Sequence, residues 1–314
     1  MITVVRYRED DEALWNKFNE ESKNSLFMFD RKYMDYHKDR FKDHSLMFYE
    51  EDKLVAILPL SENEKELVSH GGLTYGGFIT DIKMKQHTMN ECFEAFIEYA
   101  RNHNFKVIYY KTIPHIYHEQ PAEEDRYSLY INNAELIRVE PSTVINLNQS
   151  LKMPKGRKAQ ISRARREGVL IEKRDTLQAF EEFISLENEV LSSRHETKAV
   201  HTGAELKLLH DRLPNNIHLY VAVYKENIVA GTVIYEYEKV IHTQYMAANE
   251  IARQIGALDL TVNTVMENYK ESKKWLDFGI STENGGRILN EGLISQKEGF
   301  GGRTDVYTMW KITV

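Results

Sequence analysis

The chain repeats one order of apolar and polar segments twice, in residues 46–110 and 219–278. Each copy starts with two short β-rich runs around a polar turn and continues with a third such run. A segment with apolar positions at helical spacing and a closing apolar run complete each copy. The offset between matching positions falls from 174 residues at Val55 and Val229 to 168 at Val107 and Trp275. Two duplicated and independently trimmed domains would give this drift.

The pattern predicts four strands in each copy, at 46–49, 54–60, 65–70 and 106–110 in the first and at 219–224, 228–235, 239–245 and 275–278 in the second. It predicts helices around 89–100 and 255–269, and further helices upstream of each copy, around 11–22 and 175–192. A helix that leads to a final parallel strand implies a mixed sheet covered by helices. We therefore expect an α+β fold in two domains, 1–145 and 146–314, joined near residues 140–155.

Composition narrows the class of protein. The length of 314 residues suits two domains, and a single cysteine excludes a disulfide framework and a cysteine-based zinc site. Cys92 lies on the apolar face of its predicted helix, which indicates a core residue. No apolar run approaches the ~18 residues of a membrane span, and the first residues become charged too early for a secretory signal. We expect a cytoplasmic protein with no metal site and no tightly bound cofactor.

The charge of the chain is uneven. The net charge is −7, but residues 152–174 hold nine Lys and Arg against two Glu. Such a segment can bind a phosphate-bearing ligand or an RNA backbone, with Arg157 and Arg163 as candidate substrate-binding residues. A solvated helix face is the alternative, and no aromatic residue within the segment offers base stacking.

Three stretches of the sequence resemble the GNAT acyltransferase superfamily, and specifically its tandem FemAB-like branch, whose members add amino acids to peptidoglycan precursors. They are the basic helix at 156–169, the strand and turn at 277–283, and the Lys-plus-Phe-Gly segment at 289–303. The resemblance implies two tandem GNAT-like domains, with the active site in the second. It also implies an N-acyltransferase acting on an amine, such as a cell-wall or nucleotide-sugar precursor, with acyl-CoA or aminoacyl-tRNA as co-substrate.

Two departures from the family leave the donor open. Single-domain GNAT enzymes hold the coenzyme A pyrophosphate on a Q/R-x-x-G-x-G/A loop at a helix start, where backbone amides bind anions. The equivalent place keeps Arg253 and Gly256, the candidate cofactor-binding residues, but ends on Leu258. Family members that use aminoacyl-tRNA often carry a helical arm in the second domain, and residues 175–218 leave no room for one.

The resemblance also points to catalytic candidates. Lys297 lies in a glycine-rich segment, where a cation can neutralise a phosphate or an oxyanion, although a surface lysine is the alternative. Tyr245 lies where a GNAT-like fold splays its strands, so it can donate a proton to the leaving group, or it can be a core aromatic. Glu283 follows a strand, where partial burial would make it a general base, or it can cap a turn.

Neighbouring residues complete the expected site. His242 and Gln244 share one face of their strand by alternation, with Tyr245 on the other face, and we expect both to bind substrate. The resemblance adds Asn290 to the substrate-binding set. A different class of function is also open, since a catalytically degenerate GNAT-like fold could serve as a binding module for an anionic or nucleotide ligand.

Overall fold

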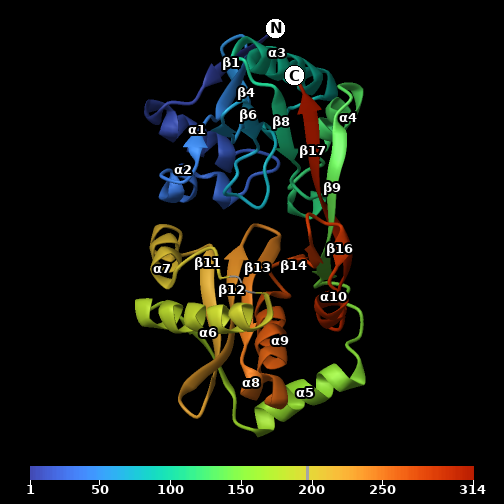
Figure 1. The fold of residues 1–314 in the computed structure, drawn as a ribbon. Coiled ribbons are helices and arrows are strands. Elements are labelled where there is room, and N and C mark those ends of the chain that lie inside the picture. The colour runs from blue at the N-terminus through green and yellow to red at the C-terminus, as the bar shows by residue number, and fades with distance from the viewer. Residues whose placement is uncertain (196–197) are drawn as a thin grey trace. The chain divides into compact units, whose positions relative to one another are not determined.

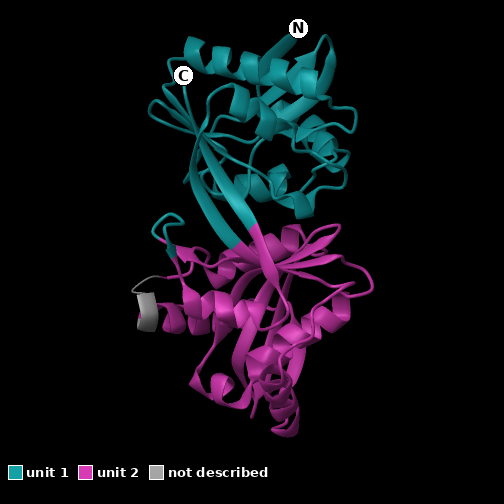
Figure 2. Ribbon diagram, turned by 90° about the vertical axis from the view of Figure 1, so that its right-hand side faces the viewer, with its two compact units in different colours: residues 1–141, 284–288, 306–314 teal, residues 142–283, 289–305 magenta. Residues whose placement is uncertain are grey.

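The computed structural model describes residues 1–195 and 198–314, and the chain divides into two compact units (Figure 2). Unit 1 comprises Met1–Pro141, Asn284–Ile288 and Val306–Val314, and unit 2 comprises Ser142–Glu283 and Leu289–Asp305. Two strands, β9 (Glu135–Asn146) and β17 (Arg303–Thr313), contribute residues to both units. Within the described ranges, no helix is long and apolar enough to cross a lipid bilayer.

Unit 1 combines antiparallel strands with one parallel pair. Its helices are α1 (Glu12–Glu20), α2 (Arg31–Met34), α3 (Gln86–Asn102) and α4 (Glu124–Ile131). The strands β1 (Ile2–Arg6), β3 (Leu46–Glu50), β4 (Lys53–Leu58) and β7 (Ile79–Thr80) form one sheet in the order β1-β3-β4-β7. A second set runs β8 (Val107–Lys111), β6 (Glu66–Val68), β5 (Ser61–Asn63) and β2 (Lys42–Asp43), in which β6 and β8 are parallel.

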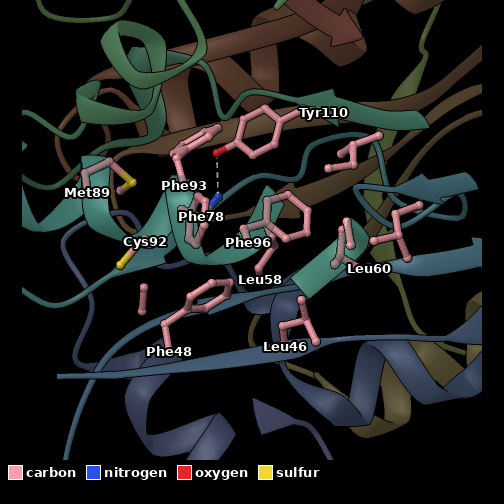
Figure 3. Close-up of a cluster of buried hydrophobic side chains, with 14 of the residues drawn as sticks. Leu46, Phe48, Leu58, Leu60, Phe78, Met89, Cys92, Phe93, Phe96 and Tyr110 are labelled. Carbon is pink, nitrogen blue, oxygen red and sulfur yellow. Dashed lines mark hydrogen bonds between the residues drawn. The ribbon is translucent and has the colours of Figure 1, made fainter. Parts of the chain in front are cut away.

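Aromatic side chains fill the core of unit 1 between α3 and the strands (Figure 3). Phe48 and Phe78 pack edge to face with ring centroids 4.8 Å apart, and Phe96 lies against both rings. Cys92 is fully buried in this cluster, and burial raises the pKa of its thiol to about 12. The prediction that Cys92 is a core residue is therefore confirmed.

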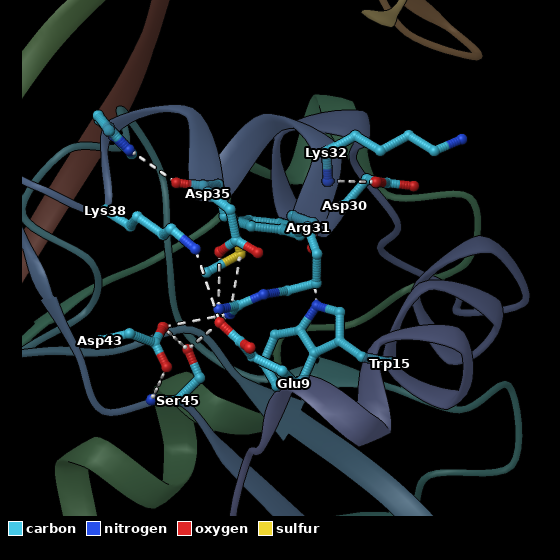
Figure 4. Close-up of polar contacts among 12 residues, drawn as sticks. Glu9, Trp15, Asp30, Arg31, Lys32, Asp35, Lys38, Asp43 and Ser45 are labelled. Carbon is cyan, nitrogen blue, oxygen red and sulfur yellow. Dashed lines mark hydrogen bonds and ion pairs between the residues drawn. The ribbon is translucent and has the colours of Figure 1, made fainter.

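A buried arginine lies at the centre of a network of polar contacts in unit 1 (Figure 4). The guanidinium of Arg31 forms ion pairs with Asp35 at 2.8 Å and Asp43 at 3.2 Å. It also lies 3.9 Å from the ring centroid of Tyr7. A buried charge needs counter-charges and hydrogen bonds, and these contacts supply them to the guanidinium of Arg31. The network therefore has a structural role in unit 1.

The glycine-rich segment 69–77 packs against protein rather than lining an open site. Gly77 has φ of +87°, and a Cβ there would lie 2.7 Å from the Tyr110 hydroxyl and 2.8 Å from the Lys111 carbonyl. The Lys111 ammonium donates hydrogen bonds to the carbonyls of His70 and Leu73. These glycines allow the close approach of β8 to the segment.

Unit 2 is a mixed sheet with helices on both faces (Figure 1). The strand order is β10 (Leu170–Arg174), β11 (Ile217–Tyr224), β12 (Asn227–Glu236), β13 (Val240–Ala248), β14 (Trp275–Ile280) and then β9. The helices are α5 (Lys155–Arg166), α6 (Leu177–His195), α7 (Gly203–Arg212), α8 (Glu250–Ile255), α9 (Ala257–Tyr269) and α10 (Glu291–Glu298). Two short strands, β15 (Thr282–Glu283) and β16 (Ile288–Leu289), lie between β14 and α10.

The two faces of this sheet carry different helices. Apolar residues of α9 pack with Ile234, Ile241 and Leu276, and α5 and α8 extend this layer. On the opposite face α6 contacts β12 and β13, and a Cβ on Gly231 would lie 2.9 Å from the Phe183 ring of α6. Figure 1 shows α6 lying across these strands.

The predicted mixed α/β class is confirmed, and each predicted strand and helix has a counterpart in the structure. The long strands β9 and β17 and the helices α7 and α10 were not predicted. The predicted helix at 255–269 is divided at Gly256 into α8 and α9.

Candidate active site in unit 2

Strands β13 and β14 part in the middle of the unit 2 sheet. They pair in parallel only from Val240 and Trp275 to His242 and Asp277, although β13 continues to Ala248 and β14 to Ile280. Beyond the last pair, the facing edges of the two strands no longer bond to each other in a regular ladder. Backbone groups at such a parting can bind a ligand.

A β-bulge at Gln244 corrects one prediction about this strand. Val233 pairs with Tyr245, whereas the next residue, Ile234, pairs with Thr243, so Gln244 has no partner in β12. A bulge interrupts alternation, and the residues on either side of it then share a face. His242 and Tyr245 therefore both lie on the α6 face, and the prediction that Tyr245 points away from His242 is wrong.

Asp277 is fully buried at the parting and is held on several sides. Its Oδ1 accepts hydrogen bonds from the Ser142 hydroxyl at 2.5 Å and from the Gly279 amide at 2.9 Å. Its Oδ2 lies 3.4 Å from Nδ1 of His242 on β13. Strands β9, β13 and β14 thus each contribute one side chain to a single polar cluster.

Lys297 extends from α10 to the end of β14. The side chain is only 4 % exposed, and its ammonium donates hydrogen bonds to the carbonyls of Gly279 at 2.9 Å and Ile280 at 2.7 Å. Burial lowers the pKa of Lys297 to about 8, which the negative charge of Asp277 partly opposes. Since an ammonium has three N–H donors, one remains beyond the two carbonyls.

Tyr245 extends toward the loop between α6 and α7. Its hydroxyl lies 2.7 Å from Nδ1 of His201 and accepts a hydrogen bond from the His201 amide at 3.3 Å. Burial raises the pKa of Tyr245 to about 12, and the charge of Glu187 on α6 adds to this effect. The phenol therefore keeps its proton at neutral pH.

Glu187 and His201 are site residues that the sequence did not identify. Glu187 is 8 % exposed, and burial raises the pKa of its carboxyl to about 7. It follows Phe180, Phe183 and Ile184 at helical spacing, so it occupies a core position of an apolar stripe. In the sequence, the signal for Glu187 is therefore a carboxylate at a helix position that should face the core.

Glu283 lies outside this buried cluster. It is exposed, in contrast to the expected partial burial, and its Oε1 accepts a hydrogen bond from the Asn290 amide at 2.8 Å. Asn290 also caps α10, because its Oδ1 accepts a hydrogen bond from the Leu293 amide. The two predicted residues are thus in contact at the start of the helix that carries Lys297.

The predicted basic helix is α5, and it contacts the segment around Lys297. Arg157 forms an ion pair with Asp259 of α9, donates to the Gln296 carbonyl at 2.8 Å and stacks 4.1 Å from the Phe300 ring centroid. Its guanidinium therefore joins three elements of unit 2. Arg163, by contrast, is exposed on α5.

Arg253 and Gly256 do not form an open loop. Arg253 lies in α8 and pairs with Glu250 at 3.3 Å. Gly256, with φ of +77°, separates α8 from α9, and a Cβ there would lie 2.5 Å from the Gln160 carbonyl of α5. Helix α5 thus packs against the backbone at Gly256, with the Gln160 carbonyl where a Cβ would lie. This packing disfavours a pyrophosphate on that side of Gly256.

Comparison with known families finds one match within unit 2. Residues 155–284 match the acetyltransferase (GNAT) domain family. The matched range contains the parting strands, Asp277, Tyr245 and Glu187, and it ends before Lys297. No curated protein sequence matches the chain.

Solved structures resemble the whole chain at low sequence identity. A structure of FemX has a TM-score of 0.71 at 10 % identity, covering 99 % of this chain and 97 % of that chain. L-PGS from Bacillus licheniformis has a TM-score of 0.65 at 15 % identity, with coverage of 97 % and 92 %. A tandem GNAT protein from the clavulanic acid biosynthesis pathway has a TM-score of 0.54 at 10 % identity, with coverage of 100 % and 98 %. These likenesses show a shared fold.

Proposed function

We propose that unit 2 moves an acyl or aminoacyl group to an amine at the parting of β13 and β14. Residues 155–284 of this unit match the acetyltransferase (GNAT) domain family, and a tandem GNAT protein is among the solved structures of similar fold. One observation carries the proposal. Tyr245 lies on β13 just beyond the last pair of these strands, and the ammonium of Lys297, which comes from α10, binds two carbonyls of β14 just beyond the same pair. A reacting carbonyl held between them has a cation and a proton donor at hand.

The proposed reaction forms a C–N bond and breaks the bond between the acyl carbon and its leaving group. The amine attacks the donor carbonyl, and negative charge develops on the carbonyl oxygen. The third N–H of Lys297 stabilises this oxyanion in a buried setting, where such donors are most effective. Tyr245 gives its proton to the departing sulfur or oxygen, which a phenol that is neutral at pH 7 can do.

The proton lost by the amine goes to a carboxylate in this proposal. Glu283 keeps one oxygen beyond its bond to Asn290 and takes the proton directly or through a water molecule. Asp277 holds His242 in place beside the parting, and His242, Gln244 and Asn290 contact the substrate. The bonds of Asp277 to Ser142 and Gly279 fit a positioning role better than a proton acceptor.

The classes of donor and acceptor are proposed from the proteins of similar structure and from helices α5 and α9. The proteins of similar structure include FemX and a lysylphosphatidylglycerol synthetase, and we propose an aminoacyl or acyl donor on this basis. The packing of α5 against Gly256 favours a donor other than coenzyme A. Exposed Arg163 and its basic neighbours on α5 would bind the phosphate of a cell-wall or nucleotide-sugar precursor, or a tRNA backbone. A cytoplasmic location stays a prediction.

A thermal-shift panel tests this proposal. We expect one donor among acyl-CoAs and an aminoacylated RNA minihelix, and one acceptor among UDP-sugars and UDP-muropeptides, to stabilise the full chain. A ligand at 100 times its Kd stabilises the folded state by about 2.7 kcal/mol. Binding of an acceptor without any donor would favour the degenerate binding module. The absence of any shift across the panel would contradict the proposal for these substrate classes.

A further inference from the structure

Glu187 is a buried carboxylate with one oxygen that has no hydrogen-bond donor among the described residues. It is 8 % exposed, and its Oε2 accepts no hydrogen bond from any residue in 1–195 or 198–314. Its surroundings raise the pKa of its carboxyl through burial alone. Leaving such a group unpaired is unfavourable, and a functional role or a bound partner is among the reasons for which natural proteins retain one.

A further unpaired acceptor oxygen lies on β13, the strand against which α6 packs. The Gln244 side chain hydrogen-bonds to the Tyr245 hydroxyl, and its own Oε1 is buried and accepts nothing from the described residues. The Gln244 bulge places Tyr245 on the α6 face, where Glu187 lies close enough for its charge to act on the phenol. The site therefore offers a carboxylate and an amide oxygen as acceptors, beside the phenol of Tyr245.

We propose that Glu187 and Gln244 bind the protonated amine of the acceptor, a primary ammonium group, beside Tyr245. Such a group has N–H donors for the unpaired oxygens of Glu187 and Gln244, and its positive charge matches the carboxylate. A divalent metal ion suits the site less well, because no group of three or more His, Cys, Asp or Glu side chains gathers there in the described chain. The inference rests on the proposed function, since amine transfer gives the bound ammonium its role.

The site also explains how the acceptor reaches the reacting carbonyl. Tyr245 lies both beside the ammonium site and at the parting of β13 and β14. An amine held by Glu187 thus lies beside the residue proposed to protonate the leaving group. The bound ammonium has no lone pair, so it first loses one proton to solvent. The neutral amine then attacks, and the second proton that it loses goes to Glu283, while Glu187 is a substrate-binding residue in this account.

Methylammonium is a probe that requires no knowledge of the natural acceptor. In the full chain at about pH 8, where Glu187 is ionised, we expect it to give saturable NMR shifts at the Gln244 side-chain amide and the His201 backbone amide. Glu187→Gln should weaken this binding at least about tenfold, since it removes the counter-charge. Gln244→Met, which keeps the carboxylate, should weaken it less. Glu189→Gln is the matched control, because Glu189 is an exposed residue of the same helix, and it should bind like the parent.

Two further probes separate charge from hydrogen bonding. Tetramethylammonium carries the charge without N–H donors and methanol lacks the charge, so both should fail to give the saturable shifts. Equal binding of methanol, equal affinity in Glu187→Gln, or no saturable shift with methylammonium up to about 0.1 M would overturn the assignment. If methylammonium binds through Glu187 but no amide forms with any donor, acyl transfer fails and the ammonium site stands. If transfer occurs with the same amine KM in Glu187→Gln, the site fails and the function stands.

Discussion

Replacing Lys297 with methionine is expected to lower the rate of acyl transfer by about 10²–10³-fold, the usual effect of removing one donor to an oxyanion. Methionine has a similar length and keeps the apolar stem, so the loss reflects the ammonium. The stability of the full chain should change much less than the rate, because two effects oppose each other. The carbonyls of Gly279 and Ile280 lose their buried donor, but the unfavourable burial of a charge, which lowers the pKa of Lys297 to about 8, is also removed. Transfer assays and urea unfolding of the same preparation measure both effects.

Lys273 provides the matched control for this substitution. Its ammonium also donates to two carbonyls of unit 2, those of Tyr237 at 2.7 Å and Glu238 at 3.2 Å, but it lies in the turn after α9. Lys273 also pairs with Glu236 at 3.0 Å, so Lys273→Met should lower stability, and it should leave the transfer rate unchanged. Equal transfer rates in Lys297→Met and the parent would remove Lys297 from the mechanism.

Replacing Glu187 with glutamine is expected to stabilise the protein at about pH 8 by about 3 kcal/mol relative to the parent. The folded state holds the carboxyl of Glu187 at a pKa of about 7, against an ordinary value of 4.5. Between these two values the folded chain retains a proton that the unfolded chain has released. Folding stability from this group therefore falls as the pH rises from about 4.5 to about 7.

Glutamine has no such dependence, so the difference between variant and parent should be small at about pH 4 and reach its maximum above about pH 7. Urea unfolding followed by circular dichroism at several pH values measures it. Glu189→Gln, at an exposed position of the same helix, should show little change at any pH. A Glu187→Gln variant no more stable than the parent at pH 8 would show that the carboxylate is solvated or paired.

The regular elements of unit 2 follow from the spacing of apolar residues. The hairpin of β11 and β12 is two β-rich runs around Lys225, Glu226 and Asn227, and both runs are almost wholly buried in the sheet. Periodicity predicts such elements because each residue's environment depends on its neighbours in sequence. Lys297 and Tyr245 could also be predicted from local sequence, because the segments that contain them resemble a known superfamily.

The geometry of the site could not be predicted because it depends on pairing between distant segments. The bulge at Gln244 is a property of the register between β12 and β13, and it decides which face Tyr245 occupies. Ser142 reaches Asp277 only because β9 pairs with β14, across more than a hundred residues of sequence. In the sequence Glu187 is one of several acidic residues of α6, and only its burial in the folded structure distinguishes it from Glu189.

The mass of the acceptor after a single turnover tests the central claim most directly. The full chain is incubated with a donor identified by the thermal-shift panel and with a primary amine, and the amine is analysed by mass spectrometry. The account predicts that the parent adds the mass of the donor's acyl group to the amine nitrogen, and that Lys297→Met does so at least about 10²-fold more slowly while Lys273→Met matches the parent. An amine that gains no acyl mass with any bound donor, or gains it equally fast with Lys297→Met, would contradict acyl transfer at this site.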